Sequence, residues 1–413
     1  MKILNFGSCN IDYVYSLDHI VRVGETETTG GLSVFPGGKG LNQSIALARA
    51  GAAVWHAGCI GEGGEFLCEL LRENGVDTSF LQTVDEKNGH AIIQVSRDGE
   101  NSIFLYPGSN ERVTREQIDR TLSHFSAGDL LLLQNEINEL SYLIRQAHER
   151  GMTVLLNPSP YNESIQESDF AMLDYLILNE VEAKEITGGE SPEECLGYFE
   201  QHHPQLKIML TLGKRGCVYA ERGKRTGHPV FRVIPADTTA AGDTFTGYFV
   251  AGVASGADMQ KTLRTASHAA AITVSRKGAA PSIPTLAEVR ASTLTPEPYE
   301  PTGKRERLLA TLDAYLNETL ATASISQLAE RWGYAAAYAG QTVKTLTGKS
   351  FSVLLCEYRV KRAAELLITS DLSVEEIIHA VGYENQSFFR RAFVEIYGMN
   401  LLEYRKKMRG ESK

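Results

Sequence analysis

The stretch "IPADTTAAGDTFTG", from Ile234 to Gly247, places small residues between an extended segment and a long apolar helix. Small side chains at a helix N-terminus leave backbone N–H groups accessible, here those of Ala241, Gly242 and Asp243, and the helix dipole adds positive potential. Such a site suits the charge of a transferring phosphoryl group. The Asp243 carboxylate can accept the proton of an attacking hydroxyl, or it is simply a favourable first-turn acid.

A second stretch, "PGGKGLNQSIALARAGA" (Pro36–Ala52), begins another helix with two glycines. Gly38 and the glycine before it allow a close backbone approach, and Lys39 and Asn42 supply donors for hydroxyl groups. Taken alone, this pattern is also typical of a simple turn.

Polar residues also follow apolar strands elsewhere in the chain. Asn10 and Asp12 lie beyond the first predicted strand in "SCNIDYVYSL", and Glu136 ends "LLLQNE". Ligands of open α/β sheets bind beyond the carboxyl ends of the strands, so we expect these side chains to converge at one edge.

The first 290 residues alternate between strand-like and helix-like segments. Runs such as "DLLLLQ" and "YLILN" are apolar on both faces, which predicts central strands of a doubly wound α/β sheet covered by helices on both sides. The predicted strands are Ile3–Gly7, Ala91–Ser96, Ser102–Tyr106, Leu130–Gln134, Thr153–Asn157, Tyr175–Leu178 and Ile208–Leu212. The predicted helices are Gly40–Ala50, Glu65–Asn74, Glu139–Arg150, Pro192–His203, Gly242–Ser255 and Met259–Val274.

A chain of 413 residues is long for one domain, and its charge is unevenly distributed. Residues 304–413 carry 16 Lys and Arg against 13 Asp and Glu, a net charge of +3, whereas residues 1–303 carry 25 against 38, a net charge of −13. The proline-rich stretch "ASTLTPEPYEPTG" separates the two parts. We therefore predict a domain over 1–290, a linker over 291–303 and a domain over 304–413.

Other features of the composition restrict the class of protein. The chain contains no run of 18 apolar residues, so we expect no membrane span, and its N-terminus does not resemble a signal peptide. The six cysteines are scattered without a C-x-x-C pair, which favours a reduced cytoplasmic protein without a zinc site.

The last 110 residues predict helices only. "ISQLAERWGYAAAYAGQTVKTLTGKSF" (Ile325–Phe351) and "VEEIIHAVGYENQSFFRRAFVEIYGMNLLEYR" (Val374–Arg405) each predict a short helix, a glycine turn and a second helix. Val353–Ser370 has the periodicity of one long connecting helix. Helix–turn–helix units place their second helix in the major groove of DNA, so two units can address adjacent groove segments.

Residues 1–290 resemble the ribokinase-like (PfkB) carbohydrate kinases at several stations in order, including "GSCNID", "GGKGLN", "GENSIFLYPGSN", "DTTAAGDTFTG" and "RKGAAPSIP". The resemblance implies a doubly wound sheet with a small β lid over residues 11–36 and 90–106. It implies ATP as cofactor, with Asp243 as catalytic base and Ala240, Ala241 and Gly242 as the anion hole.

The same resemblance assigns the other ligands of the site. The sugar would be held by Asn10, Asp12, Gly38, Lys39, Asn42, Glu136 and Asp243. ATP phosphates would lie along Thr211, Gly213 and Gly216, and Asn179 and Glu182 would organise Mg²⁺ through water. A monovalent cation, K⁺, would be held by the stretches of Asp237, Thr239, Thr273, Arg276, Gly278 and Ser282, mostly through backbone carbonyls.

Residues 305–410 resemble the AraC family of transcription regulators through "RVKRAAELL", "IIHAVGYENQSFFRRAF" and "YGMNLLEYR". The resemblance implies binding to double-stranded DNA. The candidate contact residues are Gln341, Lys344, Gln386, Ser387, Arg390 and Arg391. A net charge of +3 is low for tight non-specific binding, so we expect a homodimer.

Together these patterns predict a sugar-responsive transcription regulator whose first domain binds, and with ATP phosphorylates, a sugar, D-ribose first among the candidates. Two alternatives remain open at this point. One is a working sugar kinase with secondary or vestigial DNA binding, and the other is a regulator whose kinase domain is inactive.

Overall fold

The computed structural model covers residues 1–413, and its described residues are all of these except 99, 163–164, 166–169, 298–303 and 410–413. The chain divides into two compact units, Met1–Glu300 and Pro301–Lys413. Within the described residues, no helix has both the length and the apolar character needed to cross a membrane.

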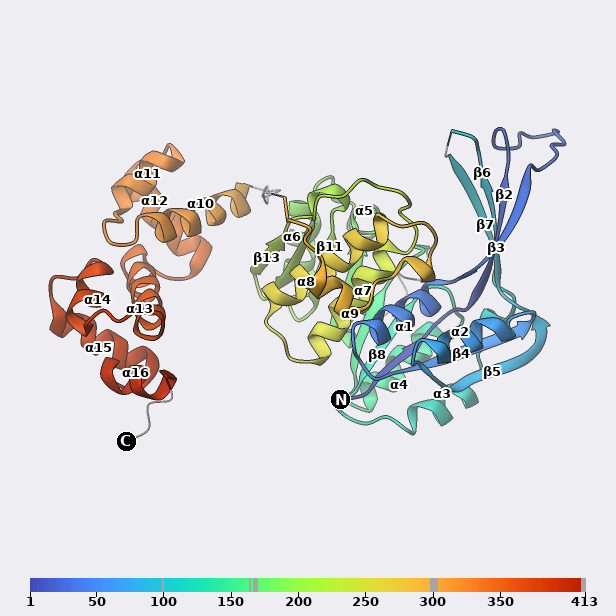
Figure 1. The fold of residues 1–413 in the computed structure, drawn as a ribbon, viewed down its shortest axis with the longest axis horizontal. Coiled ribbons are helices and arrows are strands. Elements are labelled where there is room, and N and C mark those ends of the chain that lie inside the picture. The colour runs from blue at the N-terminus through green and yellow to red at the C-terminus, as the bar shows by residue number, and fades with distance from the viewer. Residues whose placement is uncertain (99, 163–164, 166–169, 298–303, 410–413) are drawn as a thin grey trace. The chain divides into compact units, whose positions relative to one another are not determined.

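The first unit is built on a nine-stranded sheet in the order β13-β12-β11-β10-β9-β8-β1-β4-β5 (Figure 1). Its strands are β1 (Ile3–Phe6), β4 (Val54–Glu62), β5 (Asp77–Lys87), β8 (Leu130–Gln134), β9 (Thr153–Asn157), β10 (Tyr175–Asn179), β11 (Lys207–Thr211), β12 (Cys217–Glu221) and β13 (Lys224–His228). The strands from β11 to β5 are parallel, while β12 and β13 pair antiparallel at one edge.

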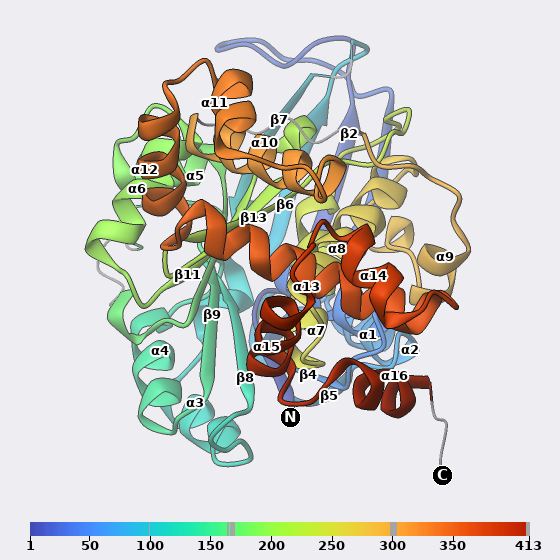
Figure 2. The same cartoon turned by 90° about the vertical axis from the view of Figure 1, so that its left-hand side faces the viewer.

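Helices cover both faces of this sheet because its central strands are apolar on both sides. Along β8, Leu130 and Leu132 pack into one core, while Leu131 and Leu133 pack into the other. The first core receives α1 (Lys39–Arg49), α2 (Glu65–Glu73), α7 (Ala241–Ala254), α8 (Met259–Val274) and α9 (Leu286–Ala291). The second receives α3 (Arg115–Leu122), α4 (Leu140–Glu149), α5 (Glu180–Thr187) and α6 (Pro192–His202). Figure 2 shows α3 and α4 on one side of β8 and β9, with α1 and α2 on the other.

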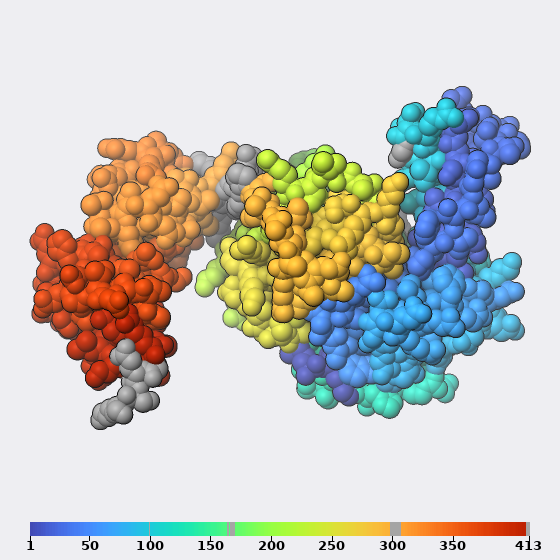
Figure 3. Space-filling view, viewed as in Figure 1, coloured from blue at the N-terminus to red at the C-terminus, as the bar shows by residue number. Residues whose placement is uncertain are grey.

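A second, four-stranded sheet has the order β3-β2-β6-β7. It consists of β2 (Asn10–Ser16), β3 (Gly31–Gly37), β6 (His90–Val95) and β7 (Asn101–Tyr106). Figure 3 shows this sheet, in blue and cyan, standing clear of the body of the first unit. Its four strands are formed almost entirely by residues 11–36 and 90–106, the ranges predicted to form a lid.

The end of the first unit differs from a free linker. Phe231 forms an isolated antiparallel bridge with Pro296, and the amide of Glu297 donates to the carbonyl of Val230 at 2.8 Å. The predicted linker therefore begins as a segment docked on the first unit, and its residues 298–303 lie outside the described residues.

The second unit is helical throughout its described residues. Its helices are α10 (Lys304–Glu318), α11 (Ile325–Trp332), α12 (Ala336–Thr347), α13 (Phe351–Thr369), α14 (Val374–Ala380), α15 (Gln386–Tyr397) and α16 (Leu401–Arg409). Gly333 ends α11 with φ of 67°, in the left-handed conformation that glycine tolerates best. One small core joins α10 to α13, and another joins α13 to α16, which gives two helix–turn–helix units connected by α13 as the sequence predicts.

Candidate functional site

The predicted sugar and phosphate residues meet beyond the carboxyl ends of the central strands. A cavity of about 230 Å³ lies there, between the beginnings of α1, α5 and α7. Its lining includes Lys39, Asn157, Asn179, Glu182, Thr211, Ala240, Gly242 and Asp243. Side chains and backbone from five separate stretches of the sequence thus converge on one space.

Asp243 lies in the first turn of α7, and only 8% of its surface is exposed. Its Oδ2 accepts a hydrogen bond from Nδ2 of Asn42 at 3.0 Å, and its Oδ1 accepts one from Nε2 of Gln43 at 2.9 Å. Both donors come from α1, which packs against α7. Two amides therefore fix the orientation of a carboxylate that lines the cavity.

The orientation of Gln43 is itself fixed by a buried network. Its Nε2 also donates to Oδ1 of Asn157 at 3.1 Å, and its Oε1 accepts from Nε2 of Gln134 at 2.7 Å. Asn157 in turn donates to the carbonyl of Ile177 at 2.8 Å. Rotating the Gln43 amide would set its oxygen against two acceptors. Gln43 and Asn157 were absent from the sequence prediction, and the only signal for Gln43 is its place beside Asn42 in "GLNQS".

The N-terminus of α7 supplies backbone donors to the same cavity. Ala240 is left-handed, with φ of 59°, and the first helical hydrogen bond runs from the amide of Thr244 to its carbonyl. The amide of Ala241 is directed to the carbonyl of Thr238 at 3.3 Å. The amides of Gly242 and Asp243 precede the helical ladder, so they are the donors suited to an anion. The predicted anion hole of Ala240, Ala241 and Gly242 is therefore replaced by the two amides of Gly242 and Asp243. A Cβ on Gly242 would meet no atom within 4 Å, so this glycine leaves open space at that point.

Several of the residues predicted to bind the sugar are charged, and their charges shift one another's pKa values. Glu136 accepts from the amide of Lys39 at 3.0 Å and from the hydroxyl of Ser8. Burial raises the pKa of the Glu136 carboxyl, and it raises that of Asp12 to about 7, with the charges of Glu136 and Asp243 adding to the rise. Burial opposes the charged form of Lys39, but the carboxylates of Asp243, Glu136 and Glu182 hold its pKa above the usual value.

Gly38 and Asn10 join the lid to this site. Gly38 has φ of 93°, and a Cβ there would lie 2.8 Å from the amide nitrogen of Asn10, so the close approach of β2 and α1 requires glycine. The side chain of Asn10 is buried and accepts from Nδ2 of Asn110 at 2.6 Å. Asn110 was likewise missing from the predicted site, although it ends the quoted stretch "GENSIFLYPGSN".

Asn179 and Glu182, the predicted Mg²⁺ residues, form the cap of α5. Oδ1 of Asn179 accepts from the amides of Val181 and Glu182, and Oε2 of Glu182 accepts from the amide of Asn179 at 2.9 Å. Within the described residues no group of three or more His, Cys, Asp or Glu side chains can enclose a metal. The Glu182 carboxylate in the phosphate cavity still fits a Mg²⁺ ion that keeps most of its waters and binds phosphate oxygens.

A second cavity, of about 560 Å³, adjoins the first and shares Thr211, Thr238 and Gly242 with it. The predicted ATP residues Gly213 and Gly216 lie in its wall. The remaining wall is largely apolar and includes Val230, Phe231, Val233, Pro235, Phe245, Ala270, Ala271 and Val274. The pair of cavities therefore offers a polar end for phosphates and an apolar end for a flat ring.

The predicted monovalent-cation residues are brought together only in part. Oδ1 of Asp237 accepts from the amide and hydroxyl of Thr239, and Oδ2 accepts from the amide of Gly278 at 3.0 Å. Burial works against ionisation, but these hydrogen bonds hold the pKa of Asp237 below its usual value. Arg276 instead pairs with Glu288 at 2.8 Å. The side chains of Thr273 and Ser282 are buried and bonded to Thr244 and to the carbonyl of Ala279, which leaves ligation to backbone carbonyls.

In the second unit, the candidate DNA residues lie on α12, with Gln341 in its middle and Lys344 in its last turn, and in the first half of α15. Gln341 and Lys344 are exposed on α12, and Ser387, Arg390 and Arg391 are exposed on α15, where Gln386 is half-buried. Neither Arg390 nor Arg391 forms an ion pair with any residue that the structure describes. Both guanidinium groups are therefore available to phosphate or to base edges.

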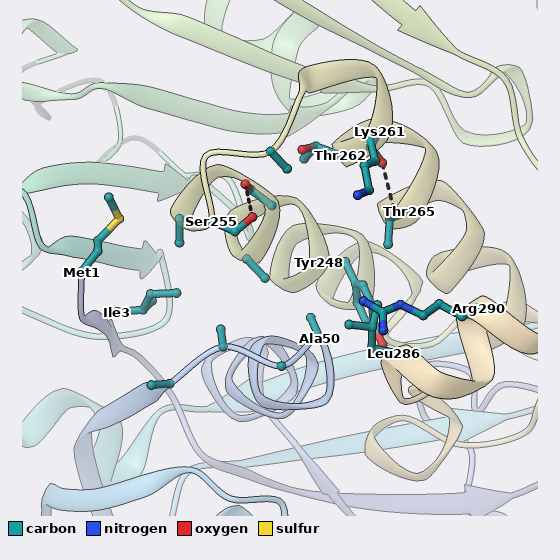
Figure 4. A pocket seen from close by; sticks show the side chains of 17 residues that line it. Met1, Ile3, Ala50, Tyr248, Ser255, Lys261, Thr262, Thr265, Leu286 and Arg290 are labelled. Carbon is teal, nitrogen blue, oxygen red and sulfur yellow. Dashed lines mark hydrogen bonds between the residues drawn. The ribbon is translucent and has the colours of Figure 1, made fainter. Parts of the chain in front are cut away.

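A third hollow, of about 370 Å³, lies at the other end of α7, around Ser255 (Figure 4). Residues Ala50–Ala53 and the side chains of Lys261 and Arg290 line it. It contains none of the residues predicted for sugar, phosphate or cation binding.

Comparisons with known proteins agree with this geometry. Residues 1–286 match a family model described as pfkB family carbohydrate kinase, and residues 328–407 match a model described as helix-turn-helix domain. The ribokinase of Haemophilus influenzae is 35% identical, over 68% of this chain and 95% of its own. A ribokinase structure from Cryptococcus neoformans in complex with ADP has a TM-score of 0.63 at 36% identity, covering 70% of this chain and 99% of its own. The Arabidopsis thaliana ribokinase complexed with ribose and ATP has a TM-score of 0.64 at 27% identity, covering 70% and 97%.

Proposed function

Because the chain belongs to the pfkB family of carbohydrate kinases and carries an AraC-type helix-turn-helix domain, we propose that it is a sugar-responsive transcription regulator. Its first unit binds a sugar and phosphorylates it with ATP, and D-ribose is the first candidate. One observation carries the kinase part of the proposal. Asp243, oriented by two amides, lines the same cavity as Gly242 at the N-terminus of α7.

The reaction uses the site residues in distinct roles. Asp243 takes the proton of the sugar's primary hydroxyl as that oxygen forms a bond to the γ-phosphorus. The bond from the γ-phosphorus to the bridging oxygen breaks, and ADP leaves. The amides of Gly242 and Asp243 stabilise the charge on the transferring group. Asn10, Asp12, Gly38, Lys39, Asn42 and Glu136 hold the other hydroxyls of the sugar.

Cations complete the proposed site. Mg²⁺, held through water by Asn179 and Glu182, would neutralise charge on the β- and γ-phosphates. K⁺ would bind the carbonyls of the loops around Asp237 and Gly278. Thr211, Gly213 and Gly216 would line the phosphates of ATP, since all three lie in the wall of the larger cavity.

DNA binding is assigned to α12 and α15, and we propose that the protein acts as a dimer through its lid. Register places Val34, Tyr13, Ile92 and Phe104 in one row across the four strands. This row consists of aromatic and aliphatic side chains; Tyr13 packs in part against the core of the first unit, and the outer two side chains are 50% and 55% exposed. An exposed apolar sheet of this kind marks an interaction surface, and a dimer would place two DNA-binding units on paired half-sites.

The main alternative is a working sugar kinase with vestigial DNA binding. A regulator with an inactive kinase unit is less favoured, since Asp243, its two amide partners and the α7 amides are all in place. One experiment separates these functions. ADP release is measured with a panel of pentoses and hexoses, beside binding of the full-length chain to DNA from its own upstream region. Turnover without DNA binding would support the alternative, and DNA binding without turnover would support the inactive kinase.

A further inference from the structure

The side chain of Asn110 lies at the base of the lid, where three strand ends meet. The lid strand β2 begins at Asn10, β6 begins directly after Gly89, and β7 ends at Tyr106, shortly before Asn110. Figure 1 shows these strand ends drawing together where the lid joins the body of the first unit. Asn110 and Asn10 are 1% and 5% exposed, so two amides are buried together at this junction.

The orientation of the Asn110 amide is fixed by a backbone group. Its Oδ1 accepts a hydrogen bond from the amide of Cys9 at 3.0 Å. A backbone N–H can only donate, so the oxygen of Asn110 must face Cys9 and its NH₂ must point elsewhere. The Cys9 residue is held at its carbonyl as well, since Nδ2 of Asn88 donates to that oxygen at 2.9 Å. Asn110 is therefore a fixed donor toward Asn10.

This donor in turn fixes the amide of Asn10. Nδ2 of Asn110 donates to Oδ1 of Asn10 at 2.6 Å. Gly89 makes room for this contact, because a Cβ there would lie 2.1 Å from Nδ2 of Asn110 and 2.6 Å from Oδ1 of Asn10. Reversing the Asn10 amide would set two NH₂ groups against each other. The NH₂ of Asn10 is therefore directed away from Asn110, and it donates to no residue that the structure describes.

The proposed sugar site is rich in hydrogen-bond acceptors. Asp12, Glu136 and Asp243 each bring a carboxyl group to it. The Nδ2 atom of Asn42 already donates to Asp243 at 3.0 Å. Asn10 and Asp12 are two residues apart on β2, so their side chains lie on the same face of this strand. A sugar hydroxyl whose proton is accepted by a carboxylate still needs a donor to its oxygen, and the NH₂ of Asn10 is suited to that role.

We propose that Asn110 is a positioning residue of the sugar site, which turns the amide of Asn10 so that its NH₂ donates to a sugar hydroxyl. The inference rests on the proposed function, because it takes the sugar from it. Asn110 acts through Asn10 and does not itself contact the sugar. Replacing Asn110 should therefore change sugar binding and leave nucleotide binding as it is.

Two substitutions of Asn110 separate this role from a structural one. Asn110→Asp keeps an acceptor for the Cys9 amide, but its second oxygen requires the NH₂ of Asn10, which turns the oxygen of Asn10 toward the sugar. An acceptor in place of a donor should raise the Kd of the sugar roughly 10- to 100-fold. Asn110→Leu removes both hydrogen bonds and leaves Asn10 free to take either orientation, so the Kd should rise only about 2-fold. A purely structural role predicts the reverse order, because leucine is the more disruptive change.

The test measures binding of D-ribose to the full-length protein by calorimetry, without nucleotide and at pH 8. Binding of a β,γ-methylene analogue of ATP and unfolding in urea are measured on the same variants. Both substitutions of Asn110 are also made in an Asn10→Ala background. Because the amide that Asn110 positions is then absent, neither substitution should change the Kd of the sugar further.

Asn138→Asp is the matched control. The side chain of Asn138 is a half-buried amide that accepts from the N–H of Val113 at 3.1 Å and donates to its carbonyl at 2.8 Å, three residues after Asn110. The substitution therefore disturbs an anchor of the same loop without touching Asn10. It should leave the Kd of D-ribose close to that of the wild-type protein.

A larger loss of sugar affinity in Asn110→Asp than in Asn110→Leu, absent in the Asn10→Ala background, would support the inference. Wild-type sugar affinity in Asn110→Asp, a larger loss in Asn110→Leu, or a loss of equal size in both backgrounds would overturn it and leave the proposed function intact. Should Asn110→Asp not fold, the response of Asn110→Leu in the two backgrounds decides between these outcomes. Absence of D-ribose binding by the wild-type protein would overturn the proposed sugar site and the inference together.

Discussion

Replacing Asp243 with asparagine should separate catalysis from folding and sugar binding. The carboxylate accepts from Nδ2 of Asn42 and from Nε2 of Gln43, so an asparagine at 243 must direct its oxygen at one donor and its NH₂ at the other. Gln43 is locked as a donor on this side by Asn157 and Gln134. The oxygen of the new amide must therefore face Gln43, and its NH₂ must face Asn42.

Asn42 can adapt to this change. Its Oδ1 is buried and has no hydrogen-bond partner among the described residues, so the amide can rotate and present that oxygen to the NH₂ at position 243. The rotation exchanges a charge-assisted hydrogen bond for a neutral one, a loss of about 1 kcal/mol. Asp243→Ala instead leaves both donors without an acceptor, at about 1–3 kcal/mol for each. The alanine variant should therefore be the less stable of the two.

Turnover should fall sharply in Asp243→Asn although this variant keeps most of its stability. Loss of a general base reduces kcat by roughly 10²–10⁴-fold, and the asparagine variant keeps the hydroxyl pocket. ADP release, calorimetric sugar binding and urea unfolding of the two variants test this together. Near wild-type turnover of Asp243→Asn would refute the role of base. An asparagine variant as unstable as the alanine variant would refute the proposed rotation of Asn42.

Three further predictions concern charge, DNA and assembly. The pKa of Asp12 is raised from 3.8 to about 7, so ionisation of this carboxyl lowers the stability of the fold increasingly from pH 4 to pH 7. Asp12→Asn should therefore raise the melting temperature at pH 8 and leave it nearly unchanged at pH 4. Equal effects at both pH values would contradict this. DNA binding should fall steeply with salt, and Arg390→Ala should weaken it by roughly 1–3 kcal/mol in anisotropy titrations; unchanged affinity would remove Arg390 from the interface. Val34→Asp combined with Phe104→Asp, both on the apolar row of the lid, should yield monomers in sedimentation, and a persistent dimer would exclude this face as the dimer surface.

The sequence predicts the strands that are buried on both faces and misses others for identifiable reasons. Leu130–Gln134 and Thr153–Asn157 are uninterrupted apolar runs, and their predicted bounds are confirmed. Val54–Glu62 contains His56 and two glycines, so it does not read as a strand; the glycine at 58 is needed because a Cβ there would lie 2.4 Å from the carbonyl oxygen of Gly7. Asp77–Lys87 lies at the sheet edge and is largely polar.

The sequence predicts a site residue where a charged side chain stands at the end of a predicted helix or strand. Asp243, Lys39 and Glu136 stand directly at the ends of predicted elements. The role of Gln43 cannot be predicted from the sequence, because its contact with Asp243 spans 200 positions. In addition, the sequence does not distinguish a buried amide from any other polar residue of a helix. The pairing of Pro296 and Glu297 with Val230 and Phe231 was also unpredictable, because a proline-rich segment has the composition of a linker whether or not it pairs with a neighbour.

The charges of the site favour a sensor that responds to sugar before catalysis. The carboxylates of Asp243, Glu136 and Glu182 act on a single ammonium, that of Lys39, whose pKa they hold high, and Asp12 feels the charges of Glu136 and Asp243. Burial raises the pKa values of Asp12 and Glu136, and the charges of neighbouring carboxylates add to the rise. Sugar hydroxyls can donate to these carboxyls without adding charge, whereas the phosphates of a nucleotide need a cation beside them. We therefore expect the sugar to bind without a cation or phosphate, which is what the proposed sugar-responsive regulator requires of a domain that also retains the geometry of a kinase.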